Sequence, residues 1–410
     1  MTLRSKTPML AAAVSGIALV AAGCGTASSG HQQAFAVSSP RSASPATAPG
    51  SAGSSSCAAS AATGAPAQVP ALNAIQFVSS RQGWAAGAGQ VLATSDGGHT
   101  WTRQYSGPAA IDQVDFVDAQ HGWAVGASTL LGTANGGATW SVMQDPCGSI
   151  RSVHFVTPDL GYAVAGGSQV RLDGGVPAPA VGGRLLTTTD GGQHWAALAG
   201  APAHVQSACF TSASSGFLGT PGKIWSTSDS GRHWSVAFTE PAATGAAHPG
   251  PDTAVLQCAG TGAASGAWVL FLGQGAALGH SPYLAYAMQN AQTARPLFEE
   301  TYIESAARPQ LHAPDGPGSY PGPFSAIGPD AAVFVGFNPA VGYGAATVMT
   351  VTGSGLSRTA NVSAISQAYG VAFVSDTQGW VVGKNARTGE YTIDATANGG
   401  HTWTRQYQTR

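Results

Sequence analysis

Charged side chains are the first candidates for chemistry in this chain, because so few are present. They make up only 9% of the 410 residues, and the net charge is -2. Three of the five glutamates, Glu299, Glu300 and Glu304, lie in one segment together with Tyr302 and Arg308. We expect this segment to be a binding loop, since long loops on a rigid scaffold often carry function.

Acid–base catalysis of glycoside hydrolysis needs two carboxylates that flank a cleft. Asp112 with Asp173 or Glu390 could supply such a pair, but nothing in the spacing selects them. The eleven histidines are scattered, no Cys/His spacing is that of a zinc site, and no block of like charge suggests nucleic-acid binding. The sequence therefore predicts no metal, no cofactor and no nucleic-acid partner.

The N-terminus is typical of an export signal. Arg4 and Lys6 precede an apolar run at 9–22 that is too short to span a bilayer. The run leads into Ala-Ala-Gly-Cys, which resembles a bacterial lipobox with Ala21 in place of the usual Leu. The alternative is an ordinary secretory signal with Cys24 incidental. We expect a lipoprotein signal peptide at 1–23 and a lipidated Cys24 on the extracytoplasmic side of the cell membrane.

A linker and a repeat domain follow the signal. Residues 24–66 are rich in Gly, Ala, Ser and Pro, which cannot bury a core, so they are predicted to be a flexible tether. Residues 67–410 contain a repeat whose units start with a run such as VDFV, continue with GWAVG and end in a turn before a tryptophan. That tryptophan is Trp101, Trp140, Trp195, Trp234 or Trp403.

The repeat predicts the fold. The motif tryptophans up to Trp234 are 39, 55 and 39 residues apart, and the 169 residues from there to Trp403 leave room for two degenerate units, at 255–298 and 324–357. Each unit contains short runs typical of β-strands. A single four-stranded sheet cannot bury its own two faces, so the units must pack on one another. We therefore predict an all-β fold, a seven-bladed β-propeller of four-stranded antiparallel blades. The nine residues GGHTWTRQY occur in both the first and the last unit, at 97–105 and 399–407.

The turn before each motif tryptophan has a mechanical explanation. An Asp or Asn side chain accepts backbone N–H groups across a turn, and a Gly two residues later supplies backbone angles that other residues avoid. The tryptophan then packs back on the sheet. A structural role is therefore predicted for the tryptophans and for Asp96, Asn135, Asp190, Asp229 and Asn398.

Four cysteines other than Cys24 favour two disulfides in an exported chain. Four cysteines allow three pairings. The alignment of the repeats favours Cys209–Cys258, which leaves Cys57 with Cys147.

The GWAVG and TTDGGxTW motifs resemble BNR (Asp-box) repeats, and most closely those of the photosystem II stability/assembly-factor-like group. The resemblance covers five of the seven units. It implies a seven-bladed propeller and an assembling membrane-protein partner held by an arginine-rich surface. This chain has no arginine cluster, which departs from that pattern.

A binding site is expected on the propeller face opposite the Asp-box turns, where the inner strands start. The position four residues before the first-strand phenylalanine, or its equivalent, is occupied by Asn73, Asp112, Arg151, Gln206 and Tyr369. Asp112 and Arg151 could pair across the channel mouth. A sixteen-residue excess in the third unit adds Arg171 and Asp173 to the same face, and the glutamate-rich segment adds Tyr302, Glu304 and Arg308. A ring of solvated strand starts without a ligand is the alternative.

The function predicted from these features is a non-catalytic binding or assembly scaffold. Its partner is expected to be a protein or glycan of the cell envelope. The alternative is a glycoside hydrolase, because Asp-box proteins include sialidases. Arg151, Arg171, Arg308, Tyr302 and Glu304 could formally fill sialidase roles, but the Arg-Ile-Pro signature of those enzymes is absent from the first unit.

Overall fold

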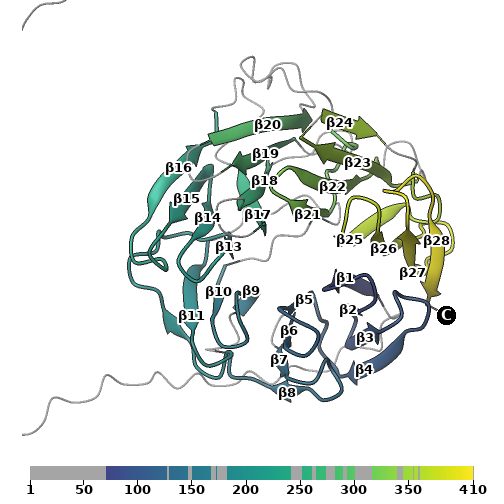
Figure 1. The fold of residues 1–410 in the computed structure, drawn as a ribbon, viewed down its shortest axis with the longest axis horizontal. Helices are drawn as coiled ribbons and strands as arrows, with labels where there is room; N and C mark the ends of the chain where they lie inside the picture. The colour runs from purple at the N-terminus through teal and green to yellow at the C-terminus, as the bar shows by residue number, and fades with distance from the viewer. Residues whose placement is uncertain are drawn as a thin grey trace, which may run out of the picture. The chain divides into compact units, whose positions relative to one another are not determined.

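Seven four-stranded sheets form a closed ring in the computed structural model (Figure 1). The structure describes residues 71–409 apart from 127–128, 146–149, 168–171, 173–181, 242–251, 261–264, 274–281, 290–292, 301–315, 339–344, 354 and 359–360. All strand pairs within the sheets are antiparallel. No helix in the described residues could span a bilayer. The predicted all-β, seven-bladed architecture is confirmed.

Each blade uses its four strands in chain order from the inside of the ring to the outside. The innermost strands are β1 (Leu72–Phe77), β5 (Gln113–Phe116), β9 (Ile150–Phe155), β13 (Ser207–Phe210), β17 (Thr253–Ala259), β21 (Phe324–Gly328) and β25 (Gln367–Phe373). The second strands are β2 (Gly83–Gly87), β6 (Gly122–Gly126), β10 (Gly161–Ala165), β14 (Gly216–Thr220), β18 (Gly266–Leu272), β22 (Ala331–Gly336) and β26 (Gly379–Lys384).

The two outer strands of each blade complete the sheets. The third strands are β3 (Gln90–Thr94), β7 (Thr129–Thr133), β11 (Arg184–Thr188), β15 (Lys223–Thr227), β19 (Tyr283–Gln289), β23 (Thr347–Thr352) and β27 (Tyr391–Thr396). The outermost strands are β4 (Thr102–Ser106), β8 (Ser141–Val142), β12 (Ala196–Ala197), β16 (Ser235–Thr239), β20 (Thr293–Glu300), β24 (Gly355–Arg358) and β28 (Thr404–Gln408). The degenerate fifth and sixth units are therefore complete blades, and Glu299 and Glu300 end a strand rather than start a loop.

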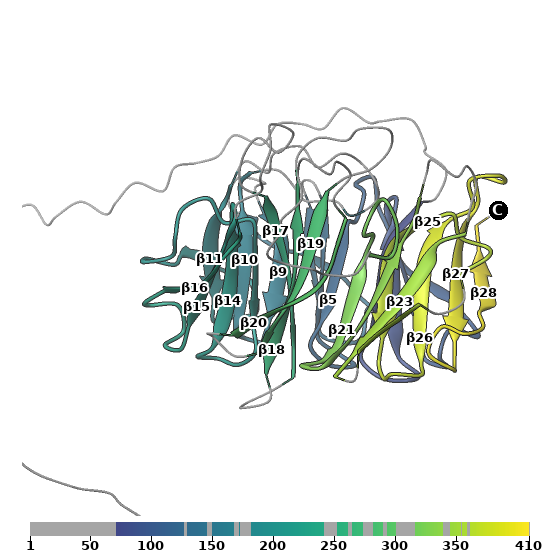
Figure 2. The ribbon, with the colours of Figure 1, turned by 90° about the horizontal axis from the view of Figure 1, so that it is seen from above.

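The strands run between two faces of the ring (Figure 2). Because the strands alternate in direction, the turns from first to second and from third to fourth strand lie on one face, which we call the Asp-box face. Backbone bonds join these two turns within a blade: Gly97 N donates to Arg81 O at 2.8 Å, and Gly136 N donates to Gln120 O at 2.8 Å. The inner strands start on the opposite face, which we call the mouth face.

Parallel-stacked aromatic pairs join neighbouring blades at four interfaces. Trp84 of β2 is fully buried and stacks on Phe116 of the next blade, with ring centroids 3.5 Å apart. Its Nε1 also donates to the carbonyl of Gly136, in the next blade's Asp-box turn, at 2.9 Å. Phe116 in turn meets Trp140 edge-on, at 5.9 Å. The equivalent stacked pairs are Trp123–Phe155, Tyr162–Phe210 and Trp380–Phe77.

This stacking explains the glycine of the GWAVG motif. A Cβ on Gly122, the residue before Trp123, would lie 2.2 Å from the ring of Phe116. The phenylalanine can turn its ring toward the neighbouring blade only because this position has no side chain.

Polar side chains also join neighbouring inner strands. The residue before the strand-end phenylalanine faces the next blade, and Gln76 Oε1 accepts from Phe116 N at 2.7 Å. Asp115 Oδ2 accepts from Phe155 N at 2.7 Å, and His154 Nε2 lies 2.8 Å from Phe210 O. Burial raises the pKa of the Asp115 carboxyl, while the neighbouring His154 and the Phe155 N–H act in the opposite direction.

The predicted Cys209–Cys258 disulfide is present and takes the same inter-blade position. Cys209 precedes Phe210 as Gln76 precedes Phe77, and Cys258 occupies the equivalent register in β17. The bond joins the fourth blade to the fifth, where the aromatic stack stops because Ala259 stands in place of the phenylalanine. Cys57 and Cys147 lie outside the described residues, as do Cys24 and the segments 1–23 and 24–66.

Candidate functional site

The Asp-box turns have one shared hydrogen-bond pattern. In the first blade Asp96 Oδ1 accepts from Thr100 N at 2.9 Å, and Gly98, with φ of 92°, donates its N–H to Thr94 Oγ1 at 2.9 Å. The same bonds recur around Asn135, Asp190, Asp229 and Asn398. These are the bonds that the predicted structural role requires, and the structure adds the threonine two residues before the Asp or Asn.

Hydrogen bonding lowers the pKa of these turn carboxylates. The backbone N–H and then the side chain of His194 hold the pKa of Asp190 at about 2, and His233 acts in the same way on Asp229, also at about 2. The Thr100 hydroxyl and N–H lower the pKa of Asp96. These carboxylates are committed to their own turns, so they are poor candidates for an acid or base.

The five predicted residues at the mouth face lie at the starts of inner strands, and each is half-buried. Asn73, Arg151 and Tyr369 are the extra residues of β-bulges, because the pairing register shifts at each of them. A bulge re-aims a side chain that a regular strand would direct into the sheet packing. Asp112 and Gln206 stand immediately before their strands and donate backbone N–H groups to Val125 O and Gly219 O.

Gln206 and Tyr369 make side-chain contacts within the mouth face. Gln206 Oε1 accepts from Ala254 N of the next blade at 2.9 Å. The Tyr369 hydroxyl donates to Gln367 Oε1 at 3.1 Å, and its ring lies 5.6 Å from that of Tyr391. The remaining predicted site residues, Arg171, Asp173, Tyr302, Glu304 and Arg308, lie outside the described residues.

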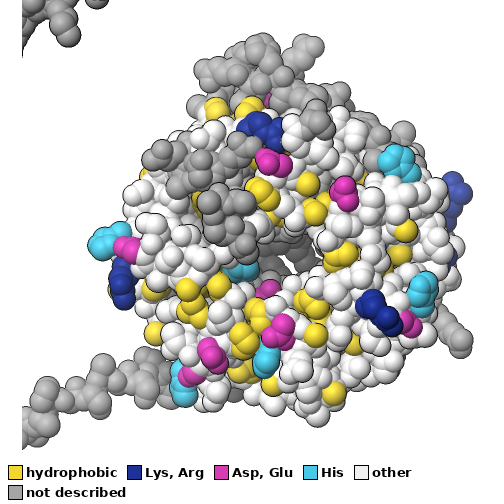
Figure 3. All heavy atoms as spheres, in the orientation of Figure 1, with side chains coloured by type: hydrophobic (Ala, Val, Ile, Leu, Met, Phe, Trp, Pro, Cys, Tyr) yellow, Lys and Arg dark blue, Asp and Glu magenta, His cyan; other side chains and the backbone are white. Residues whose placement is uncertain are grey.

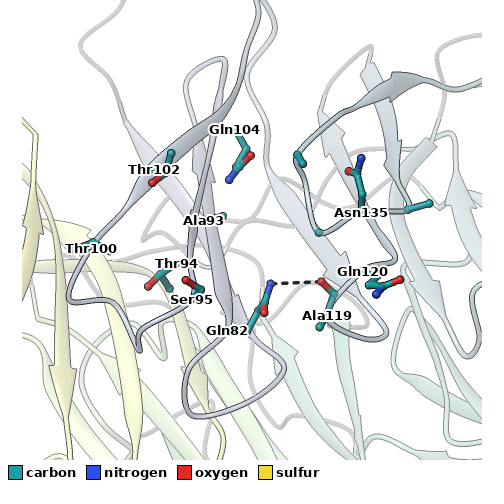
Figure 4. Close-up of a pocket in the computed structure, with 13 residues that line it drawn as sticks. Gln82, Ala93, Thr94, Ser95, Thr100, Thr102, Gln104, Ala119, Gln120 and Asn135 are labelled. Atoms are coloured by element: carbon teal, nitrogen blue, oxygen red, sulfur yellow. Dashed lines mark hydrogen bonds between the residues drawn. The ribbon is translucent and has the colours of Figure 1, made fainter.

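The structure adds a pocket that the sequence did not predict, between the first and second blades on the Asp-box face (Figure 4). Its volume is about 450 Å³. The first blade contributes Gln82, Thr94, Ser95, Thr100, Thr102 and Gln104, and the second contributes Gln120 and Asn135. The Gln82 side-chain amide of the first blade donates a hydrogen bond to the carbonyl of Ala119 in the second blade, at 3.4 Å. We call this the 1/2 groove.

An equivalent pocket of about 660 Å³ lies between the seventh and first blades. Its walls include Gln378, Thr396, Thr404 and Gln406 from the seventh blade, and Arg81, Asp96 and His99 from the first. We call this the 7/1 groove. Together the two grooves use both sides of the first blade.

Charged side chains are few on the surface of the propeller. Figure 3 shows one face on which acidic, basic and His side chains form small, separated groups on a mostly uncharged surface. Within the described residues, no three His, Cys, Asp or Glu side chains gather as a metal site would require.

These observations define a class: the chain is a seven-bladed β-propeller in which five blades carry BNR (Asp-box) turns. A family model described as photosynthesis system II assembly factor YCF48 matches residues 106–267. The predicted resemblance is confirmed over that part of the chain. Comparison with curated proteins finds no match.

Solved structures share the architecture at low identity. YCF48 from Cyanidioschyzon merolae is 15% identical, with a TM-score of 0.46, over 72% of this chain and 85% of that one. A GH74 xyloglucanase from Xanthomonas campestris is also 15% identical, with a TM-score of 0.52, over 83% of this chain and 55% of that one. This chain therefore spans about half the length of the xyloglucanase, and the likeness supports the fold alone.

Proposed function

We propose that the protein is a non-catalytic binding scaffold of the bacterial cell envelope. It holds a protein or glycan partner at its mouth face. The observation that carries this proposal is the set of half-buried polar side chains at the starts of the inner strands, three of them raised on β-bulges of a closed ring. The description of the matching family model as an assembly factor supports a binding role.

A rigid ring suits such a role. The inner strands are held by stacked aromatic pairs and by inter-blade hydrogen bonds, so the strands that carry Asn73, Arg151 and Tyr369 keep fixed relative positions. Binding residues that are positioned before the partner arrives lose less conformational entropy on binding. Arg151 is the only cation in this set, and it is the residue expected to anchor an acidic or hydroxyl-rich group.

Membrane attachment through a lipid on Cys24 is the second part of the proposal. It rests on the lipobox-like sequence and on the Gly/Ala/Ser/Pro-rich segment that follows it. A Cys24→Ser variant is expected to move from the membrane fraction to the soluble fraction. Retention of that variant in the membrane fraction would contradict lipid anchoring.

The binding role is tested by crosslinking and pull-down from native membranes. An Asn73→Ala/Arg151→Ala/Tyr369→Ala variant is expected to lose at least nine-tenths of the captured partner, with unchanged thermal unfolding. Arg103→Ala is the matched control, because Arg103 is an exposed cation on the outermost strand. Equal capture by both variants would refute the mouth-face site. Turnover of a sialoside or plant or cell-wall glycan by the purified protein would instead establish the glycosidase alternative.

A further inference from the structure

We propose that the 1/2 and 7/1 grooves are two equivalent binding sites for one neutral saccharide chain. They lie on the Asp-box face, so this site is separate from the mouth-face site of the proposed function. The inference rests on three features of the grooves: their equivalence, the glutamine that lines each of them, and the chemistry of their walls.

The two grooves use the same positions of successive blades. Gln82, Thr94, Thr102 and Gln104 of the 1/2 groove correspond in register to Gln378, Thr396, Thr404 and Gln406 of the 7/1 groove. Across the gap, Asn135 and Gly136 correspond to Asp96 and Gly97. The two copies of GGHTWTRQY supply the outer walls of both grooves. A shared ligand would explain why the two copies are identical, in addition to their shared role in the turn.

One position on the outermost strand lies beside the next blade and differs in chemistry between the blades. In the second blade it is Met143, which lies against Gly132 and near Gly192 and packs on the core beneath. In the third blade it is Leu198, which lies against Gly231. In the first and seventh blades the position is Gln104 or Gln406. Gln406 lies against Gly98 of the next blade, as Leu198 lies against Gly231. The difference is chemical: Gln104 and Gln406 line the grooves with an amide that can donate and accept hydrogen bonds.

The two glutamines differ in their contacts. Gln406 Oε1 accepts from Trp380 Nε1 at 3.1 Å. Gln104, which is half-buried, has no hydrogen-bond partner among the described residues, and the same is true of the Thr102 hydroxyl. The 1/2 groove therefore presents donors and acceptors that are not used by the fold.

The chemistry of the walls favours a saccharide. The polar side chains of the 1/2 groove carry only hydroxyl or amide groups, which can donate and accept as sugar hydroxyls do. Its apolar side chains are alanines, so it has no pocket for a large peptide side chain and no charge to hold an acidic or basic one. The 7/1 groove also carries Arg81, Asp96, His99 and Arg405. Asp96 accepts from the Thr100 hydroxyl, Arg81 Nε donates to Ser95 O at 3.4 Å, and Arg405 Nε lies 3.8 Å from Asp394 Oδ1. The 1/2 groove is therefore the neutral one of the two.

Two similar binding sites on the two sides of the first blade can bind one polymer of repeated sugar units. A volume of 450 Å³ lies within the range of small-ligand sites. A chain that occupies both grooves binds its second groove at high effective concentration, so it binds more tightly than a short fragment. We therefore expect oligosaccharides long enough to reach both grooves to bind about 10- to 100-fold more tightly than disaccharides of the same sugar.

The experiment uses the full chain on an array of neutral oligosaccharides of two to eight units, followed by calorimetric titration of the tightest binder. Gln104→Met and Gln406→Met replace the groove amide with the apolar side chain that stands at the equivalent position of the second blade. Each single variant is expected to reduce the affinity for the long oligosaccharide at least tenfold, to that of the short one. The double variant is expected to abolish binding. Gln193→Met, on an exposed residue of the third blade, is the matched control and should bind normally.

Thermal unfolding and capture at the mouth face check that the variants fold, because neither measurement depends on the grooves. Undiminished binding by the double variant, no binding of any neutral saccharide, or selective binding of neutral peptides on a parallel array would overturn the proposal. Each of these results would leave the mouth-face scaffold untouched. Loss of partner capture with intact saccharide binding would refute the scaffold instead.

Discussion

At the scale of single residues, the Asp-box carboxylates are stabilising parts of turns. Asp190 and Asp229 accept backbone N–H bonds in their own turns and sit beside His194 and His233. In the second and seventh blades, Asn135 and Asn398 make the same backbone bond without a charge. The two asparagine turns therefore serve as internal controls for the effect of the carboxylate charge on turn stability.

The first prediction concerns acid stability. The folded pKa of Asp190 and of Asp229 is about 2, below the ordinary 3.8, so their stabilisation is complete above about pH 4 and is lost as the pH falls toward 2. An Asp190→Asn/Asp229→Asn variant should lose less stability than the wild type between pH 4.5 and 2.5. Urea unfolding at several pH values measures this. Parallel curves for the two proteins would show that these carboxylates do not set the acid limit.

At the scale of strands and blades, neighbouring inner strands are joined at one repeated position. Hydrogen bonds from Gln76 and Asp115 occupy it in the first two blades, and the Cys209–Cys258 disulfide occupies it between the fourth and fifth. The covalent bond stands where the aromatic stacking between blades is interrupted. At the same interface Phe238 of the fourth blade contacts Phe271 and Tyr286 of the fifth. The disulfide therefore adds a covalent link to an interface that is also packed.

The second prediction follows from that position. Replacing both cysteines in Cys209→Ser/Cys258→Ser should lower the free energy of unfolding by about 2–4 kcal/mol. Wild-type protein treated with a reductant should fall to the same value, and the double variant should not respond to the reductant. Denaturant unfolding with and without reductant makes the comparison. A variant as stable as the wild type would contradict a structural role for this bond.

At the scale of the whole molecule, the ring closes by packing and not by exchange of a strand. The first and seventh blades each contain four strands that are consecutive in the chain. Trp380 forms the joint: it stacks on Phe77 with centroids 3.5 Å apart, and its Nε1 donates to Gly97 O at 3.1 Å. Gln378 adds a bond to Ser80 O at 3.2 Å.

The third prediction is that this joint is as strong as an internal one. Trp380→Ala should lower the free energy of unfolding by about 3–5 kcal/mol, as expected for a buried aromatic side chain. Trp123→Ala, at the interface between the second and third blades, should cost a similar amount. Trp380→Phe keeps the stacked ring and should cost less, about 1–2 kcal/mol for the lost hydrogen bond. A much smaller cost for Trp380→Ala than for Trp123→Ala would indicate a loosely closed ring.

Much of the ring could be predicted from the sequence, because each motif has a local cause. The GW glycine, the strand-end phenylalanine and the Asp-box turn recur with the geometry of one blade, and they predicted the blades and the Cys209–Cys258 bond. The grooves could not be predicted, because each forms between the outer strands of one blade and the Asp-box turn of the next, and the sequence does not give the spacing between blades. The bulges at Asn73, Arg151 and Tyr369 also escaped prediction, since one extra residue leaves the hydrophobic pattern almost unchanged.

The central claim is that the mouth face holds the partner, and site-specific photocrosslinking in intact cells tests it most directly. A photoreactive amino acid is placed at the position of Asn73 or Arg151 on the mouth face, and at the exposed Val142 on the outermost strand as the control. The account predicts one prominent adduct from each mouth-face position and none from the control. Adducts of equal yield from all three positions, or none from the mouth face, would contradict it.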